Sequence, residues 1–217
     1  MKVAPRKTYL LVCALLAVTV IRGFGGGYFW PMLTGGVSHF WFIHLHAFVF
    51  LVWMLLLLVQ AGLVIAGRVD WHRSLGVGGL YWGVLVVVVG LYISVAAPLA
   101  RQSTGQLTPD LARLVIAYNL TDMIAFIGFF AAAMIQRAQP HLHRRLIVCA
   151  ATALTGAAVG RVLPSDSIVY LFVWLIPLLV AIGAELRYER RVHPIYVLGL
   201  AVFLFMFLKV ELYALLL

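Results

Sequence analysis

The residues of this chain whose types suggest chemistry are its histidines and one aspartate inside an apolar run. Neutral imidazole is the commonest metal ligand in proteins, and histidines on separate helices also hold haem iron. Four histidines are therefore candidate ligands: His44, His46, His72 and His143. No H-E-x-x-H, C-x-x-C or E-x-x-H motif accompanies them, so the pattern leaves both haem b and a transition metal open as cofactor.

A second group of polar residues lies within one apolar run. The spacing of Tyr118, Asn119 and Asp122 places them on one face of a helix. A charge in the middle of a span costs about 2.5–3.5 kcal/mol on insertion scales, so we expect Asp122 to have a partner. Arg161 and His46 are expected at the same depth. These residues predict a ligand-binding pocket; the alternative is a structural Asp–Arg pair with histidines at the level of the lipid headgroups.

His72 and His143 each begin a His-Arg-x-Leu motif that leads into an apolar run, and Gln60 and Gln136 lie upstream of them. This echo predicts two related hairpins in which the two histidines converge on one haem iron or metal ion. The alternative is that they anchor or cap helices near the headgroups. For Lys209, near the end of the last run, we expect the side chain to reach toward the headgroups.

The composition assigns all of these residues to a membrane protein. The chain has 217 residues, 65% of them hydrophobic and only 11% charged, whereas soluble domains are about half apolar and about a quarter charged. Residues 1–217 are predicted to form a single integral membrane domain. Its two cysteines, Cys13 and Cys149, lie in apolar runs and predict no disulfide.

Apolar runs of about 20 residues predict membrane-spanning helices, because lipid cannot satisfy backbone polar groups. We therefore expect an all-α, polytopic transmembrane helix bundle with about seven spans. A Gly-rich interfacial loop is expected at 23–36, and the first run is taken as a retained anchor. The predicted runs are 8–21, 40–66, 75–97, 114–135, 146–162, 167–184 and 194–216.

The distribution of charge predicts an orientation. The net charge is +9, and the loops on the N-terminal side of the predicted bundle hold most of the 16 Lys and Arg residues. Cations gather in cytoplasmic loops, so the N-terminus is predicted to be cytoplasmic and the C-terminus periplasmic in a bacterial inner membrane. The charge indicates contact with the lipid bilayer and no nucleic-acid partner, while a homo-oligomer or other membrane subunits remain open.

Several motifs together resemble a known group. They are Gly23-Phe24, Tyr28-Phe29, His44-Leu45-His46-Ala47, Trp53, Gln60, His72-Arg73-Ser74-Leu75-Gly76, Asp122 and His143-Arg144-Arg145. Across residues 20–162 the chain is similar to a widespread set of uncharacterised bacterial inner-membrane proteins, a resemblance that implies no particular activity. A looser similarity to four-helix transmembrane b-type cytochromes implies haem held by histidines, although those proteins place the haem ligands within spans.

Three functions remain open from the sequence. The first is a haem- or metal-binding, redox-linked membrane protein. The second is a small-solute transporter or ligand-binding membrane protein, and the third is an assembly subunit without chemistry of its own. The residues do not decide whether the protein is an enzyme, and no catalytic residue is assigned.

Overall fold

The computed structural model describes residues 5–35 and 40–216, with side chains described as far as Lys209. Within these residues the secondary structure is helical and contains no strand, which confirms the all-α prediction. In chain order the elements are α1 (Arg6–Phe24), η1 (Gly25–Phe29), α2 (Trp30–Thr34), α3 (Trp41–Ile65), α4 (Val69–Ser103), α5 (Pro109–Ile135), α6 (Pro140–Ala153), α7 (Gly156–Val159), α8 (Ile168–Tyr188) and α9 (Pro194–Leu216).

Six helical segments in the described part of the chain are long and apolar enough to cross a membrane. They are α1 with η1 and α2, then α3, α4, α5, α6 with α7, and α8. The last helix, α9, has 23 residues, enough to span a bilayer by length. Several spans therefore make this an integral membrane protein that presents apolar helix surfaces to lipid.

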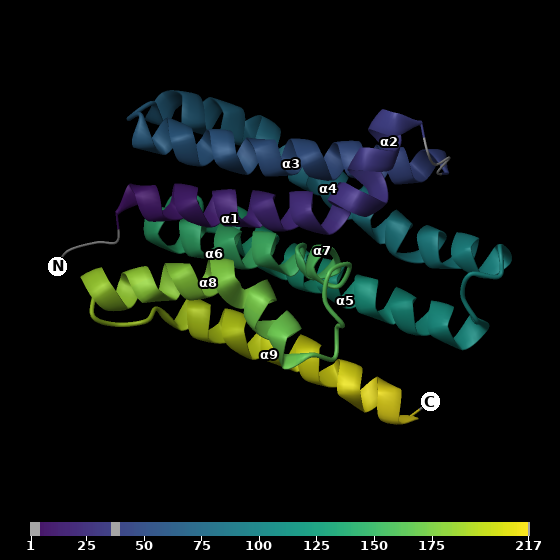
Figure 1. Cartoon of the computed structure of the whole chain (residues 1–217). Helices are drawn as coiled ribbons and strands as arrows, with labels where there is room; N and C mark the ends of the chain where they lie inside the picture. The colour runs from purple at the N-terminus through teal and green to yellow at the C-terminus, as the bar shows by residue number, and fades with distance from the viewer. Residues whose placement is uncertain (1–4, 36–39, 217) are drawn as a thin grey trace.

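The helices run alternately in opposite directions, so the two termini lie at opposite ends of the bundle (Figure 1). At one end α1, α4, α6 and α9 begin and α3, α5 and α8 end. We call this the basic end, because it holds Arg6, Lys7, Arg68, Arg73, Arg137, Arg144, Arg145, Arg187, Arg190 and Arg191. The other end, which we call the distal end, holds Arg22, Arg101, Arg113 and Arg161.

Helix α6 lies at the centre of the bundle, in contact with α1, α5, α8 and α9. In the span formed by α6 and α7, 67% of the apolar 18-residue stretch is buried inside the protein, whereas the corresponding share is 22–50% in the other spans. The buried stretch from Cys149 to Ala153 has small side chains, which let neighbouring helices approach closely. A Cβ on Gly199 of α9 would lie only 2.8 Å from the sulfur of Cys149.

The predicted Gly-rich loop at 23–36 is wrong as far as Gly35, since this stretch continues the first helix as η1 and α2. Glycine lowers helix stability by about 1 kcal/mol, but an unpaired backbone group in lipid costs more. The backbone therefore remains hydrogen-bonded, with η1 in the wider π-helical form. The helix ends at Gly35, whose φ of 69° is in the left-handed region.

Helices α4, α5 and α6 begin earlier than their apolar runs predicted. The segments between the predicted runs, 67–74, 98–113 and 136–145, were expected as loops but are mostly first or last turns of helices. The first turn of a helix has free N–H groups and accepts polar residues and proline. Pro109 and Pro140 occupy such positions. As a result His72 and His143 lie on helices and not in loops.

The predicted span 146–162 also ends differently. Helix α6 stops at Ala153, and only the single turn α7 follows. The carbonyl of Thr152 at this break accepts hydrogen bonds from Trp174 Nε1 and from the Thr155 hydroxyl, both at 2.8 Å. The buried break is therefore satisfied by side chains. Arg161 lies in the turn after α7, outside the helix where it was expected.

Candidate ligand-binding site

Asp122 is the central residue of the 27-residue helix α5, about 20 Å from either end of that helix. Its carboxylate interacts electrostatically with the ammonium group of Lys209 on α9 and with Tyr170 on α8. The Lys209 nitrogen also lies over the ring of Tyr118, 5.1 Å from its centroid. Tyr118, Asp122, Tyr170 and Lys209 thus gather where α5, α8 and α9 meet, and we call them the Asp122 cluster.

The Lys209 ammonium is the most unusual group in this cluster. Its nitrogen is buried, yet no residue in the described part of the chain forms a hydrogen bond with it. The side chain points to α5 and not toward the headgroups, in contrast to the prediction. A lysine ammonium carries several N–H donors and no acceptor, so an acceptor brought to this position would meet a desolvated positive charge.

Asn119 is directed to a different neighbour. Its side-chain nitrogen donates to the carbonyl of Ser94 at 3.4 Å, which links α5 to α4. The Ser94 hydroxyl in turn donates to the Gly90 carbonyl of its own helix at 2.7 Å. Asn119 is therefore part of the α4–α5 contact, while Tyr118 and Asp122 face Lys209.

Arg161 has neighbours other than Asp122. Its guanidinium lies over the ring of Phe24, 4.1 Å from the centroid, and donates to the carbonyl of Ala157 at 2.8 Å. Its electrostatic neighbours are Arg101 and His46. The structure thus gives Asp122 a lysine as its charge partner, where the sequence suggested Arg161.

His44 and His46, two residues apart, lie on different sides of α3. His44 Nδ1 and the Tyr28 hydroxyl are 2.9 Å apart, and a shallow hollow of about 310 Å³ opens beside them. The ring of His46 packs on Phe50 with centroids 4.1 Å apart. His46 Nδ1 is buried without a hydrogen-bond partner among the described residues.

His72 and His143 are close enough at the basic end to interact electrostatically. Nδ1 of His143 is 2.9 Å from the Ala133 carbonyl. Because a carbonyl only accepts, Nδ1 carries the proton, and this ring caps the end of α5. His72 lies against the backbone of Gln60. Both rings therefore connect their helix to the preceding one.

The metal prediction gains no support from the arrangement of these side chains. Within residues 5–35 and 40–209, no group of three or more His, Cys, Asp and Glu side chains is placed to hold a metal ion. His39, which precedes α3 in the sequence, lies outside the described residues. The four predicted histidine ligands are divided between the two ends of the bundle.

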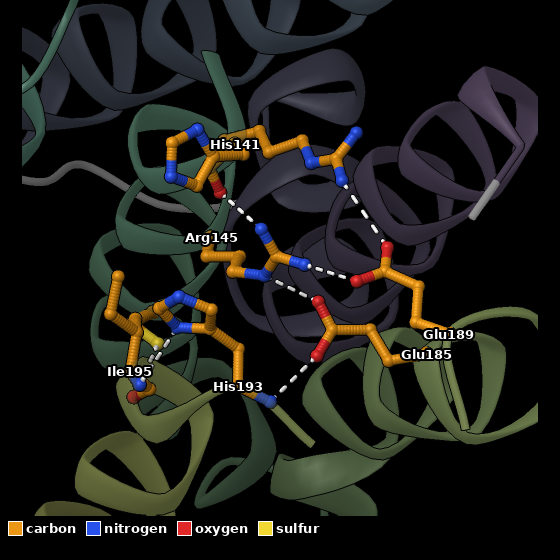
Figure 2. A network of polar contacts seen from close by, with 8 residues as sticks. His141, Arg145, Glu185, Glu189, His193 and Ile195 are labelled. Atoms are coloured by element: carbon orange, nitrogen blue, oxygen red, sulfur yellow. Dashed lines mark hydrogen bonds and ion pairs between the residues drawn. The ribbon is translucent and has the colours of Figure 1, made fainter. Parts of the chain in front are cut away.

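A network of ion pairs at the basic end was not predicted (Figure 2). The side chain of Arg145 on α6 is 2% exposed and that of Glu185 on α8 is 0% exposed, and the two form an ion pair. A second nitrogen of Arg145 lies 2.9 Å from Glu189. The other oxygen of Glu185 accepts from the backbone N–H of His193 at 2.9 Å. Arg145 therefore joins α6 to α8, and Glu185 joins this pair to the turn before α9.

His193 extends this network into the turn that begins α9. Its Nδ1 accepts from the N–H of Ile195 at 3.2 Å, and its ring centroid is 6.5 Å from that of His141. Partial burial, and then the positive charge of Arg145, lower the pKa of His193 below its ordinary value of 6.5. The neutral ring is thus the form that fits this turn.

The sequence contains a signal for this network. Glu185 and Glu189 are separated by one helical turn and therefore share a face of α8, in a chain with only 7 acidic residues. Two scarce acids on one face, opposite the paired Arg144 and Arg145, predict an interhelical ion-pair network. In the sequence analysis, the charges of these loops were used only to predict which side of the membrane they face.

Comparison of the chain with protein families, with curated proteins and with solved structures gave no match. Function must therefore be inferred from the geometry of the polar groups themselves.

Proposed function

We propose that this membrane protein binds a small polar solute between α5 and α9, at Asp122 and Lys209. The observation that carries the proposal is the buried Lys209 ammonium, for which the described residues supply no hydrogen bond. Burying a charged group without a hydrogen-bonding partner is costly. Ionisable residues within spans usually serve substrate or ion pathways.

The two charges also suggest the chemistry of the solute. Lys209 donates hydrogen bonds, and the Asp122 carboxylate accepts them. A solute that carries both a carboxylate and an amine or hydroxyl group satisfies both, as amino acids and hydroxy acids do. The rings of Tyr118 and Tyr170 provide apolar surface beside these charges. Such a site suits a transporter or a solute-binding membrane protein.

A ligand panel tests this proposal. Thermal unfolding of the purified protein in lipid nanodiscs is measured with amino acids, hydroxy acids, amines and sugars. A ligand at about a hundred times its Kd stabilises the folded state by about 2.7 kcal/mol. We expect an amino acid or hydroxy acid to raise the Tm of the wild type but not of Asp122→Asn or Lys209→Met.

Arg113→Gln is the matched control for this panel, because it removes an exposed cation that is paired with Asp110 at 2.9 Å. This variant should keep the ligand-induced rise in Tm. The proposal fails if no compound stabilises the wild type, or if both cluster variants keep the full effect. For a compound that does stabilise the wild type, measuring its flux into proteoliposomes distinguishes a transporter from a binding protein.

The haem- or metal-linked function is a second candidate, supported by the electrostatic proximity of His72 and His143. His143 holds its proton on Nδ1 toward Ala133, which leaves Nε2 as the ligating nitrogen. A visible absorption spectrum and metal analysis of the purified protein test this candidate. Bound haem or metal that His72→Ala and His143→Ala both remove would establish it.

The location and orientation inferred from charge also remain proposals, as does the resemblance to bacterial inner-membrane proteins. The concentration of cations at the basic end favours a cytoplasmic N-terminus. A reporter active only in the periplasm, fused after Leu217, should be active. Activity from a cytoplasmic reporter alone at that position would reverse the orientation.

A further inference from the structure

A hollow of about 310 Å³ lies toward the distal end of the bundle, between the end of the first span and α3. One of its walls is formed by η1 and α2, and the other by α3. Four of the residues that line it carry rings: Tyr28, Phe29, His44 and Phe48. Small-molecule sites usually have volumes of about 300–1,000 Å³. The hollow is therefore large enough for a ring-sized molecule, and it shares no residue with the Asp122 cluster.

Two residues of this lining carry polar groups, and these groups are hydrogen-bonded to each other. The Tyr28 hydroxyl and His44 Nδ1 are 2.9 Å apart, with ring centroids 5.8 Å apart. A phenol and an imidazole can each donate and accept hydrogen bonds. No acid, lysine or arginine is among the described residues that line the hollow. The lining therefore suits an uncharged molecule with an oxygen that forms hydrogen bonds with this pair.

The π-helical turn that carries Tyr28 is a further unusual feature of this wall. It comprises five residues, Gly25–Phe29, of which the first three are glycines. The two other residues of the turn, Tyr28 and Phe29, both line the hollow. A π-helical turn contains more residues than an α-helical turn and therefore redirects the side chains that follow. Such turns within α-helices occur frequently at functional sites.

The aromatic residues near the start of α3 indicate the depth of the hollow in the membrane. Trp41 is 68% exposed, and its ring centroid is 6.5 Å from that of Tyr92 on α4. Trp and Tyr gather at the level of the lipid headgroups. At about 1.5 Å per residue, His44 lies about 5 Å deeper than Trp41, and Leu51 of the lining about 15 Å deeper. The polar pair is thus near the headgroups, and the apolar part of the hollow reaches into the hydrocarbon.

We propose that this hollow binds a quinone from the bilayer, an uncharged ring with carbonyl oxygens and an apolar tail. Aromatic side chains of the lining offer such a ring favourable stacked or edge contacts. A quinone carbonyl accepts hydrogen bonds and a hydroquinone hydroxyl also donates them, so the Tyr28–His44 pair suits both forms. Leu33 and Phe48 of the lining are exposed on the outside of the bundle, so the ligand can enter from lipid. The site is independent of the Asp122 cluster.

Binding is tested with the full-length protein in phosphatidylcholine nanodiscs that contain a short-tailed quinone with a photoreactive azide. After illumination, labelled peptides are identified by mass spectrometry. A decyl-tailed benzoquinone without the azide is one competitor, and dodecanol, which has a tail and a hydroxyl but no ring, is the other. The variants are Tyr28→Phe, His44→Phe and Ala47→Phe, because a larger side chain at Ala47 fills the hollow. Tyr81→Phe is the matched control, because Tyr81 is 73% exposed on α4 and outside the lining.

We expect labelling within the two walls of the hollow, reduced by the competing quinone but not by dodecanol. Tyr28→Phe and His44→Phe should each raise the mole fraction of azidoquinone at half-maximal labelling about fivefold, the factor that corresponds to one lost hydrogen bond of about 1 kcal/mol. Ala47→Phe should reduce labelling most, and Tyr81→Phe should leave it unchanged. Asp122→Asn should also be labelled like the wild type, so the quinone site and the solute site stand or fail separately.

Labelling that is confined to other helices, or that excess quinone does not reduce, overturns the proposal. Equal competition by dodecanol also overturns it, because the hollow is then a crevice for any lipid chain. The same holds if Tyr28→Phe, His44→Phe and Ala47→Phe are all labelled like the wild type. Tyr28→Phe removes a single oxygen atom, so it remains a folded test if either of the other variants does not fold.

Discussion

Two buried cations, Arg145 on α6 and Lys209 on α9, have opposite hydrogen-bonding surroundings. Arg145 pairs with Glu185 and Glu189 and donates to the carbonyl of His141. The side chain of Lys209 is only partly buried, but its nitrogen is buried and no described residue accepts from it. The first cation joins helices. The second faces a carboxylate with its donors unused.

The difference shows how structural and functional charge can be told apart in one bundle. A buried ion pair whose hydrogen-bonding groups are all paired holds the neighbouring helices in one arrangement. Removal of one partner leaves the other as an uncompensated buried charge. A buried charge without hydrogen bonds adds little to folding and persists for another reason. Arg145 therefore serves stability, and Lys209 is the group proposed to bind a ligand.

Substitution of Arg145 should have the largest effect on stability. Arg145→Met leaves the fully buried Glu185 without its partner, and such a loss costs about 3–5 kcal/mol. The free energy of unfolding can be measured by titration of mixed micelles with sodium dodecyl sulfate. The double variant Arg145→Met/Glu185→Leu removes both charges and should be more stable than Arg145→Met alone. Equal instability of the two would contradict an ion-pair role.

Gly23 tests the packing of α1 on α7, which involves neither Arg145 nor Lys209. A Cβ at this position would lie 2.2 Å from a backbone oxygen of α7, so Gly23→Ala must separate two helices. Overpacking of this kind costs about 1–3 kcal/mol. Gly62→Ala is the control, because nothing lies within 4 Å of its added Cβ, and it should be neutral or slightly stabilising. If both substitutions behave alike, α1 and α7 are not in close contact.

His193 should contribute to the pH dependence of stability, with a smaller effect than the substitutions at Arg145 and Gly23. The pKa of His193 is lowered in the folded protein by partial burial and Arg145, so the unfolded state binds the proton more readily. The stabilising contribution is complete above pH 6.5, the ordinary pKa, and is lost as the pH falls below it. Protonation also removes the acceptor for Ile195 N–H.

Comparison of wild type with His193→Gln isolates this contribution from those of the other histidines. The loss of Tm between pH 7.5 and 5.5, values on either side of about 6.5, should be smaller in the variant. Parallel pH profiles for the two proteins would show that His193 has no part in the pH dependence.

The sequence predicted the helices better than their ends. Long apolar runs have one solution in lipid, which is a helix with every backbone group paired. The ends were misplaced because polar residues such as His72 and Arg145 were assigned to loops, although first helical turns accept them. The run of glycines before Tyr28 suggested a loop because glycine has a low helix propensity. In lipid, where no water can pair with the backbone, the helix continues through it.

The polar sites were predicted in part. The spacing predicted one face for Tyr118, Asn119 and Asp122. The structure brings Tyr118 and Asp122 to Lys209, whereas Asn119 is directed to α4. Lys209 was not predicted as the partner of Asp122, because its position near a helix end suggested that its side chain reaches the headgroups. Arg161 was assigned to a helix because nothing in the composition marks the break after Ala153, which depends on side chains from α8.

The stability of Lys209→Met, measured without any added solute, separates a ligand-binding lysine from a structural one. Lys209 makes no hydrogen bond to the described residues, and a carboxyl left alone in an apolar site takes up a proton and becomes neutral. Replacing the lysine with an apolar side chain of similar length should therefore leave the free energy of unfolding unchanged or raise it. A loss of about 3 kcal/mol or more, like that expected for Arg145→Met, would show that Lys209 is a structural partner of Asp122 and would exclude the role in ligand binding.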